Sequence, residues 1–326
     1  MKIIKRMLSA ALVATVALGG AVSAKTDFPT KPIRIIIPYA PGGTTDIVGR
    51  QIGQRMSEML GQAVIVENRS GANTAIGADA VARAPGDGYT LLFTNDATFV
   101  LNPLVFPALP YDVKKDFAPV ASVVYAPLVV TVGGNVPANN MNELVAYIKA
   151  SKTSLAYGSQ GPGSQPHIIG EMFNKLAGIE LIHVPYKGAG PAIIDVMGGQ
   201  ILTTFPALPS SQSHIASGRL KALAVSGDQR VKLIPDVPTL KEAGFGGMDI
   251  GAWYAFLAPA ATPPEVVEVL NSTINKILSD PAFVEKNMTA QGMSPMINTT
   301  KGLSDYIDKE SVRMKEIIAR SGAKVD

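Results

Sequence analysis

The sequence contains no cysteine, which excludes disulfide bridges, thiolate metal sites and cysteine nucleophiles together. Aromatic residues make up only 6% of the chain, against a hydrophobic content of 47%. The cores are therefore expected to be aliphatic, and an aromatic-rich carbohydrate-binding or membrane surface is not indicated. The three histidines, His167, His183 and His214, show no metal-ligand spacing such as HExxH, and no EF-hand is present. No metal and no cofactor is expected.

Neither sign of charge predominates once the amino terminus is considered. Residues 1–24 carry Lys2, Lys5 and Arg6, then a short run of apolar and small residues, and end in Ala-Val-Ser-Ala. This pattern predicts a secretory signal peptide cleaved after Ala24, because a membrane anchor needs about 20 mostly apolar residues. Removing those three cations from the 29 basic residues leaves 26 basic and 26 acidic residues. A nucleic-acid-binding protein would show a basic excess, so that class is excluded.

Strands and helices alternate along the remaining residues, whose number predicts two domains at about 100 to 200 residues each. Strands are predicted over 33–37, 63–66 and 90–94, separated by helices over 47–60 and 75–84. Short links between these elements favour parallel pairing with right-handed crossovers. Further strands are predicted over 120–124, 128–132, 155–157, 181–185, 202–205, 220–225 and 253–258. Further helices are predicted over 141–150, 167–177, 192–197 and 211–217, and from about 264, 281 and 300.

The loop over residues 39–46 (YAPGGTTD) lies between a predicted strand and an amphipathic helix. Its glycines allow the backbone to turn and present N–H groups, Thr44 or Thr45 can cap the helix, and a helix N-terminus favours an anion. Gly43 is expected to approach the ligand, with a positive φ. The segment predicts either an anion cradle or a plain strand-to-helix turn. Asp46 is expected to favour the helix N-terminus, or to pair with an ammonium group if the ligand carries one.

The loop over residues 158–167 (GSQGPGSQPH) has the same arrangement, with a strand before it and a helix after it. The hydroxyls of Ser159 and Ser164 can reach a carboxylate, and two such loops on two α/β units favour anion capture in a cleft between them. Neither serine lies in the GxSxG elbow of hydrolases, and His167 near a helix start is expected to be structural. No catalytic residue is therefore assigned, and the protein is not expected to be an enzyme.

Several segments share a pattern that is specific in combination: 28–46 (FPTKPIRIIIPYAPGGTTD), 66–69 (VENR), 86–92 (GDGYTLL), 110–112 (PYD), 116–120 (DFAPV), 184–188 (VPYKG) and 233–239 (LIPDVPT). Together they resemble the extracytoplasmic solute receptors of the Bug, or tripartite tricarboxylate transporter, family. The resemblance spans nearly the whole mature chain. It implies a periplasmic protein with the α/β fold of type II periplasmic-binding proteins, in which two doubly wound domains enclose a ligand cleft like a Venus flytrap. Domain 1 would comprise 25–125 and 250–326, and domain 2, inserted into it, 126–249.

The resemblance also implies the ligand and the site. A small organic carboxylate would be bound by one chain, expected to be a monomer, and delivered to the membrane permease subunits of a tripartite transporter. The alternative is a receptor that signals to a sensor kinase when it holds its ligand. The expected binding residues are Gly42, Gly43 and Thr44 on one side and Ser159, Gly163, Ser164 and His167 on the other, with Tyr39, Pro41, Asp46, Asn95 and Ala207 completing the site.

Two segments depart from the family pattern. Asp96 stands where members usually have small residues and threonine, which favours either a ligand with a positive group or a side chain that faces solvent. Residues 203–207 (TTFPA) lack the acidic or amide residue that often follows the phenylalanine, which leaves the distal half of the pocket open. Trp253 and Tyr254 either close the pocket by stacking or fill the core.

Overall fold

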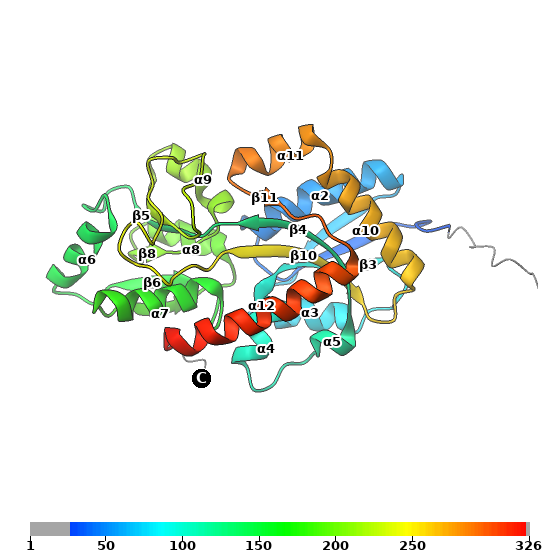
Figure 1. The fold of residues 1–326 in the computed structure, drawn as a ribbon, viewed down its shortest axis with the longest axis horizontal. Helices are drawn as coiled ribbons and strands as arrows, with labels where there is room; N and C mark the ends of the chain where they lie inside the picture. Colours follow the sequence, from blue (N-terminus) through cyan, green and yellow to red (C-terminus); the bar gives the residue numbers. More distant parts are fainter. Residues whose placement is uncertain (1–26, 324–326) are drawn as a thin grey trace, which may run out of the picture.

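The computed structural model describes residues 27–323, which form two lobes side by side (Figure 1). The predicted signal peptide, residues 1–24, lies outside these residues. Lobe 1 is built on a six-stranded sheet with the order β11-β4-β10-β3-β1-β2, and lobe 2 on a five-stranded sheet with the order β7-β6-β8-β5-β9. Among the described helices, none has the length and apolarity that crossing a bilayer requires.

Lobe 1 combines the beginning of the chain with its end. Its strands are β1 (Ile33–Ile37), β2 (Val64–Asn68), β3 (Thr90–Asn95), β4 (Phe117–Ala126), β10 (Ala252–Pro259) and β11 (Ser294–Pro295). Its helices are α2 (Thr44–Leu60), α3 (Ala75–Ala82), the π-helix η1 (Ala97–Leu101), α4 (Asn102–Val105), α5 (Val113–Asp116), α10 (Pro264–Leu278), α11 (Pro281–Asn287), the 3-10 helix η2 (Thr289–Gln291) and α12 (Thr300–Ser321). The predicted parallel pairing of β1 with β2 and β3 is confirmed.

Lobe 2 is built from the middle of the chain. Its strands are β5 (Val129–Gly133), β6 (Ala156–Ser159), β7 (Ile182–Pro185), β8 (Thr203–Thr204) and β9 (Leu220–Val225), and its helices are α6 (Met141–Ala150), α7 (Gln165–Ala177), α8 (Ala189–Met197) and α9 (Leu208–Ala216). Strand β6 pairs in parallel with β7 and β8, whereas β5 runs antiparallel to β8 and β9. The predicted order of strands and helices is therefore confirmed in this lobe.

The lobes are connected by two long neighbouring strands. β4 and β10 pair antiparallel from Ala126 and Ala252 to Phe117 and Pro259, and Figure 1 shows them running through the middle of the molecule. The main cluster of buried apolar side chains continues through both lobes, from the isoleucines of β1 to Phe173 and Phe205. Below the strands, α12 extends from lobe 1 to contact α7 of lobe 2 (Figure 1).

Helix α2 shows why the first glycine-rich loop has a fixed position. Its apolar side chains recur at Val48, Ile52 and Met56, which are all buried, as expected for one face of an amphipathic helix. A Cβ atom at Gly49 would lie 2.6 Å from Ile37 Cδ1, so the absent side chain lets the helix pack closely on the sheet. This packing holds the first turn of α2 at the carboxyl end of β1, where α/β folds place their ligands.

The segment between β3 and β4 was predicted only as a proline-containing connection. It contains η1, α4 and α5, and all five residues of η1 are buried. Short helices of four or five residues give too little periodic signal to be found from sequence, whereas burial in the tertiary structure stabilises them.

Candidate functional site

The first glycine-rich loop joins β1 to α2. Gly42 has φ +87°, whereas Gly43 is the N-cap of α2 with φ −84° and ψ 167°. The prediction of a positive φ at Gly43 is therefore wrong, because the left-handed residue comes one position earlier. The prediction that Thr44 or Thr45 caps the helix is also wrong, since both residues lie inside the first turn.

The start of α2 has unused hydrogen-bonding capacity. No side chain in residues 27–323 caps this helix, so the N–H groups of its first turn have the positive potential that binds anions. The buried Oγ1 of Thr44 also forms no hydrogen bond of normal geometry with any described residue. Thr44 lies close to the phenol of Tyr254, whose pKa is raised by burial and lowered in part by this threonine.

Asp46 holds the first loop together. Its carboxylate accepts hydrogen bonds from Gly42 N at 3.1 Å, Arg50 Nε at 3.0 Å and Asn68 Nδ2 at 3.0 Å. Burial alone would raise the pKa of this carboxyl, but the hydrogen bonds outweigh burial and lower it. The structure therefore places Asp46 behind the loop, tied to the backbone of Gly42, and its pairing with a ligand ammonium stays a prediction.

The second glycine-rich loop joins β6 to α7 and folds around one carbonyl. Ser159 Oγ and Ser164 Oγ donate to Gly161 O at 3.1 and 2.7 Å, and Ser164 N donates to the same oxygen at 3.2 Å. Gly163 has φ +76°, which favours glycine. Ser164 is the N-cap of α7, but among the described residues no side-chain cap bond is made. Both hydroxyls are buried and directed into the loop.

Two neutral histidines stack behind this loop. The ring centroids of His167 and His183 lie 4.1 Å apart. Gly163 N donates to His167 Nδ1 at 2.9 Å, and His183 Nε2 lies 2.6 Å from Ser159 Oγ. Burial lowers the pKa of each imidazole to about 4. His167 was predicted in the site, whereas His183, one strand away, was not.

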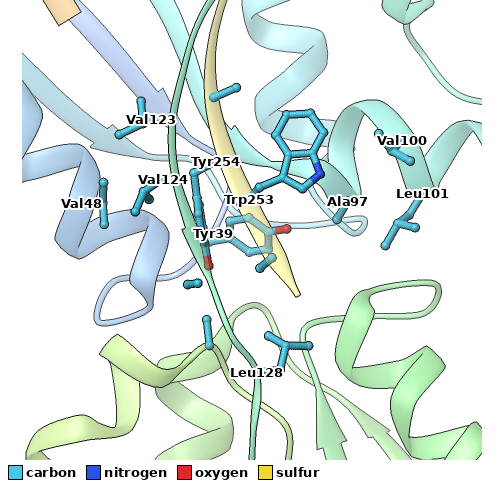
Figure 2. Packing of buried hydrophobic residues seen from close by; sticks show 14 of the residues in the cluster. Tyr39, Val48, Ala97, Val100, Leu101, Val123, Val124, Leu128, Trp253 and Tyr254 are labelled. Atoms are coloured by element: carbon cyan, nitrogen blue, oxygen red, sulfur yellow. The ribbon is translucent and has the colours of Figure 1, made fainter. Parts of the chain in front are cut away.

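Tyr39 and Asn95 form a buried pair at the carboxyl ends of β1 and β3. The phenol of Tyr39 donates to Asn95 Oδ1 at 2.6 Å, and burial raises the pKa of that phenol. Trp253 and Tyr254 are 1% and 2% exposed. Figure 2 shows Tyr39, Trp253 and Tyr254 grouped around the strands that lead to lobe 2. The alternative that the two β10 residues fill the core therefore agrees with the structure.

Asp96 does not face solvent. The residue is 2% exposed, and its Oδ1 accepts hydrogen bonds from Gln165 Nε2 and from Trp253 N. Burial raises the pKa of this carboxyl to about 7 in spite of these donors. The alternative of a solvent-facing Asp96 is therefore wrong, because the first residue of α7 covers it.

Hydrogen bonds join the lobes at the glycine-rich loops. Besides Gln165 to Asp96, Asn73 Nδ2 donates to Pro162 O at 2.7 Å, and Ala40 N donates to Lys187 O at 2.9 Å. Residues 72–74 that carry Asn73 all have positive φ, a conformation that costs non-glycine residues roughly 1 to 2 kcal/mol each. The lobes are thus in direct contact at the glycine-rich loops.

A third glycine-containing loop, 186–190, was not predicted as part of the site. It joins β7 to α8 and lies against the first loop, because a Cβ atom at Gly190 would be 2.7 Å from Pro41 O. Helix α8, like α2 and α7, begins without a side-chain cap in the described chain. The signal for this loop was present, since Gly188 lies between a strand and a helix and Gly190 is in the first turn of that helix.

A cavity of about 180 Å³ lies where these loops meet. It is lined by Pro38, Tyr39, 71–74, 160–162 and 185–187. Tyr39 is the one predicted site residue on this lining. Ala207 is the N-cap of α9, buried and bridged to Leu128.

Among residues 27–323, no group of three or more His, Asp or Glu side chains has a metal-binding arrangement.

Residues 48–323 match the family model described as tripartite tricarboxylate transporter family receptor. The chain is 36% identical over 314 residues to Protein BugT of Bordetella pertussis, covering 96% of both proteins. It is similar to the solved periplasmic binding protein BugD, with 32% identity, a TM-score of 0.86 and coverage of 91% of this chain and 99% of BugD. It is also similar to R. palustris Rpa4515 with adipate, with 31% identity, a TM-score of 0.88 and coverage of 92% and 100%.

Proposed function

This chain belongs to the tripartite tricarboxylate transporter receptor family, and we propose that it captures a small organic carboxylate in the periplasm for a transporter of that type. The two-domain α/β fold of periplasmic binding proteins is shared with solved relatives, and one of them was solved with adipate. The predicted domains, 25–125 with 250–326 and 126–249, are part of this proposal.

The observation that carries the proposal is the pair of uncapped helix starts at the cleft. Helices α6, α11 and α12 receive hydrogen bonds from capping side chains, whereas α2 and α7 receive none within residues 27–323. Each of these two follows a loop with a left-handed glycine, Gly42 or Gly163. Uncapped N–H groups at a helix start are suited to a carboxylate.

The carboxylate would be bound by the dipoles of the helix starts and not by Arg50. Arg50, the basic residue nearest the first loop in sequence, is paired with Asp46 at 2.9 Å. Backbone N–H groups and the unpartnered Thr44 hydroxyl are left to supply the hydrogen bonds. The proposed binding residues are Tyr39, Pro41, Gly42, Gly43, Thr44, Asp46, Asn95, Ser159, Gly163, Ser164, His167 and Ala207.

The experiment that tests the function is calorimetry of the mature protein with a panel of small carboxylates. One carboxylate should bind with one site per chain, and it should raise the melting temperature because it binds only the folded state. Binding of neutral sugars with no response to any acid would contradict the proposal. Copurification of the loaded protein with the membrane subunits of the transporter would test the permease partnership.

The predicted export to the periplasm and the predicted closure of the lobes are each tested by a separate experiment. Mass spectrometry of the exported protein should find Lys25 as its first residue. Small-angle scattering should give a smaller radius of gyration for the loaded protein, because the lobes would close about β4 and β10 near Tyr125 and Ile250. An equal radius at saturation would indicate a rigid pocket.

A further inference from the structure

The buried carboxyl of Asp96 lies between the two proposed carboxylate-binding loops. It follows β3 in lobe 1 and contacts Gln165, the first residue of α7 in lobe 2. It is also close enough to Tyr254, the neighbour of Thr44, to raise the pKa of that phenol. Asp96 therefore lies among groups that belong to both helix starts.

No described lysine or arginine forms an ion pair with Asp96. The charged group that acts on it is Glu310 of α12, which has the same sign. Arg313, on the same helix, is fully used by Glu310, with Nε to Oε1 at 3.0 Å and Nη2 to Oε2 at 2.8 Å. An ionised buried carboxylate without a cation costs several kcal/mol. The buried carboxyl of Asp96 is thus without a cationic partner among the described residues.

Near Asp96, some oxygen atoms that can accept a hydrogen bond have no donor among the described residues. Both of the hydrogen bonds from Gln165 and Trp253 go to Oδ1. The backbone N–H of Asp96 itself also acts on the carboxylate, and no other described residue donates to Oδ2. The Oε1 atom of Gln165 is buried and also has no partner in the described chain. Two oxygen acceptors at one place are complementary to a group with several N–H donors.

We propose that Asp96 and Gln165 receive a protonated nitrogen of the ligand, so that the ligand is a zwitterion with a carboxylate and an ammonium or guanidinium group. The proposal rests on the proposed function, because the carboxylate of the same molecule would bind at the helix starts. The ligand cation would satisfy both acceptors and neutralise the buried charge. If Asp96 only held the lobes together through Gln165, the protein would not bind a nitrogen-bearing acid more tightly than the matched acid without nitrogen.

Matched pairs of probes separate these alternatives. Calorimetry compares aspartate with succinate, glutamate with glutarate, and 4-aminobutanoate with butanoate. In at least one pair the nitrogen-bearing acid should bind the wild-type protein at least about tenfold more tightly, as expected for a desolvated charge pair. If the acids bind and the nitrogen gives no preference in any pair, the inference is overturned while the proposed function stands. If none of the probes and no other carboxylate binds, the proposed function fails, and the inference with it.

A substitution assigns the preference to Asp96. Asp96→Asn keeps the shape and removes the charge, and it should abolish the preference while the deaminated acid binds within about threefold of wild type. The control is Asp305→Asn, which removes an exposed carboxylate paired with Lys301 and should change neither affinity. A preference that persists in Asp96→Asn would exclude Asp96 as its source.

The release of a proton on ligand binding tests the same inference in the wild-type protein, so this test does not require a folded variant. The titratable groups facing Asp96 are Tyr39 of β1, Tyr125 of β4, Tyr254 of β10, and Tyr306 and Glu310 of α12. Calorimetry at pH 6.5 in buffers of different ionisation enthalpy should show the release of a proton when the nitrogen-bearing acid binds, because its cation ionises Asp96. The matched deaminated acid should release none. Equal proton release by both acids would overturn the inference.

Discussion

The loop that begins α2 is stabilised by an ionised carboxylate, whereas the loop that begins α7 is stabilised by neutral hydroxyls and imidazoles. Asp46 can be ionised because Arg50 pairs with it, and the arginine side chain is 51% exposed. Ser159, Ser164 and His167 are at most 4% exposed, and an ionised group there would be costly to bury. Both loops lie between a strand and a helix, so the topology of the fold determines their positions. The exposure of the neighbouring side chains determines whether a loop can be stabilised by charged groups.

The largest expected effect tests whether the first loop is more than a turn. Gly42→Val places a β-branched residue at φ +87° and should weaken carboxylate binding at least about hundredfold, or about 2.7 kcal/mol, by calorimetry. Gly61→Val is the control, because Gly61 also has a positive φ, +67°, and open space around it. Both variants should lose stability, but normal binding by Gly42→Val would reduce the first loop to a simple connection.

The charged network gives the next largest effect. Asp46→Ala removes three hydrogen bonds and should lower the free energy of unfolding by about 1 to 3 kcal/mol in denaturant titrations. Asp79→Ala removes a partly exposed carboxylate with the same spacing to its exposed arginine, Arg83, and should cost about 0.5 kcal/mol or less. Similar losses in the two variants would show that the loop does not depend on Asp46.

The pH dependence of stability should have opposite signs for two parts of the cleft. His167 and His183 take up protons near pH 6.5 when unfolded but near pH 4 when folded, so they destabilise the protein as the pH falls through this window. For Asp96 the pKa is raised from 3.8 to about 7. The folded protein therefore keeps a proton that the unfolded chain releases, and stability falls as the pH rises across that window.

Melting temperatures of variants between pH 4 and 7 measure these slopes. The double variant His167→Asn and His183→Gln should lose less stability than wild type on acidification. Asp96→Asn should gain stability relative to wild type as the pH rises, by a few degrees at about 2 to 4 °C per kcal/mol. His214→Gln, outside the stacked pair, should have a smaller effect of the same sign, because burial also lowers the pKa of this less buried imidazole. An unchanged slope in the double histidine variant would contradict the neutral character assigned to the second loop.

The smallest expected effect concerns Ser164. In Ser164→Ala, Gly161 O still accepts from Ser159 Oγ and from the backbone of residue 164. We therefore expect a loss of about 1 kcal/mol in stability and about threefold to tenfold in affinity. Ser321→Ala removes an equally buried hydroxyl that donates to Ile318 O at 2.8 Å and should leave affinity unchanged. A loss as large as that of Gly42→Val would mean that the Ser164 hydroxyl contacts the ligand directly.

Several features of the fold could be predicted from the sequence because they depend on neighbours along the chain. Strand β1 and helix α6 have the predicted bounds, and the first three strands pair in parallel as expected. A short apolar run or a helical spacing is a local property, so it can be recognised in the sequence without knowledge of the tertiary structure. The same holds for the positions of the glycine-rich loops, which follow from a strand before and a helix after.

Details of backbone conformation within those loops were harder to predict. Gly42 and Gly43 are adjacent glycines, and nothing in their order says which one has the positive φ. The side chains of Ser159 and Ser164 bond to Gly161 O, a choice that depends on how the loop closes on itself.

The sequence by itself determined the alternation of strands and helices, the positions of two glycine-rich loops and the resemblance to a receptor family. Only the tertiary structure decided that Gln165 meets Asp96, that Lys187 contacts Ala40, and that β10 lies between β3 and β4. The physical reason is that burial and electrostatics depend on groups distant in the sequence. Burial and the like charge of Glu310 in α12 raise the pKa of Asp96, and hydrogen bonds from Trp253 of β10 and Gln165 of α7 oppose that rise. No local pattern around residue 96 contains these groups.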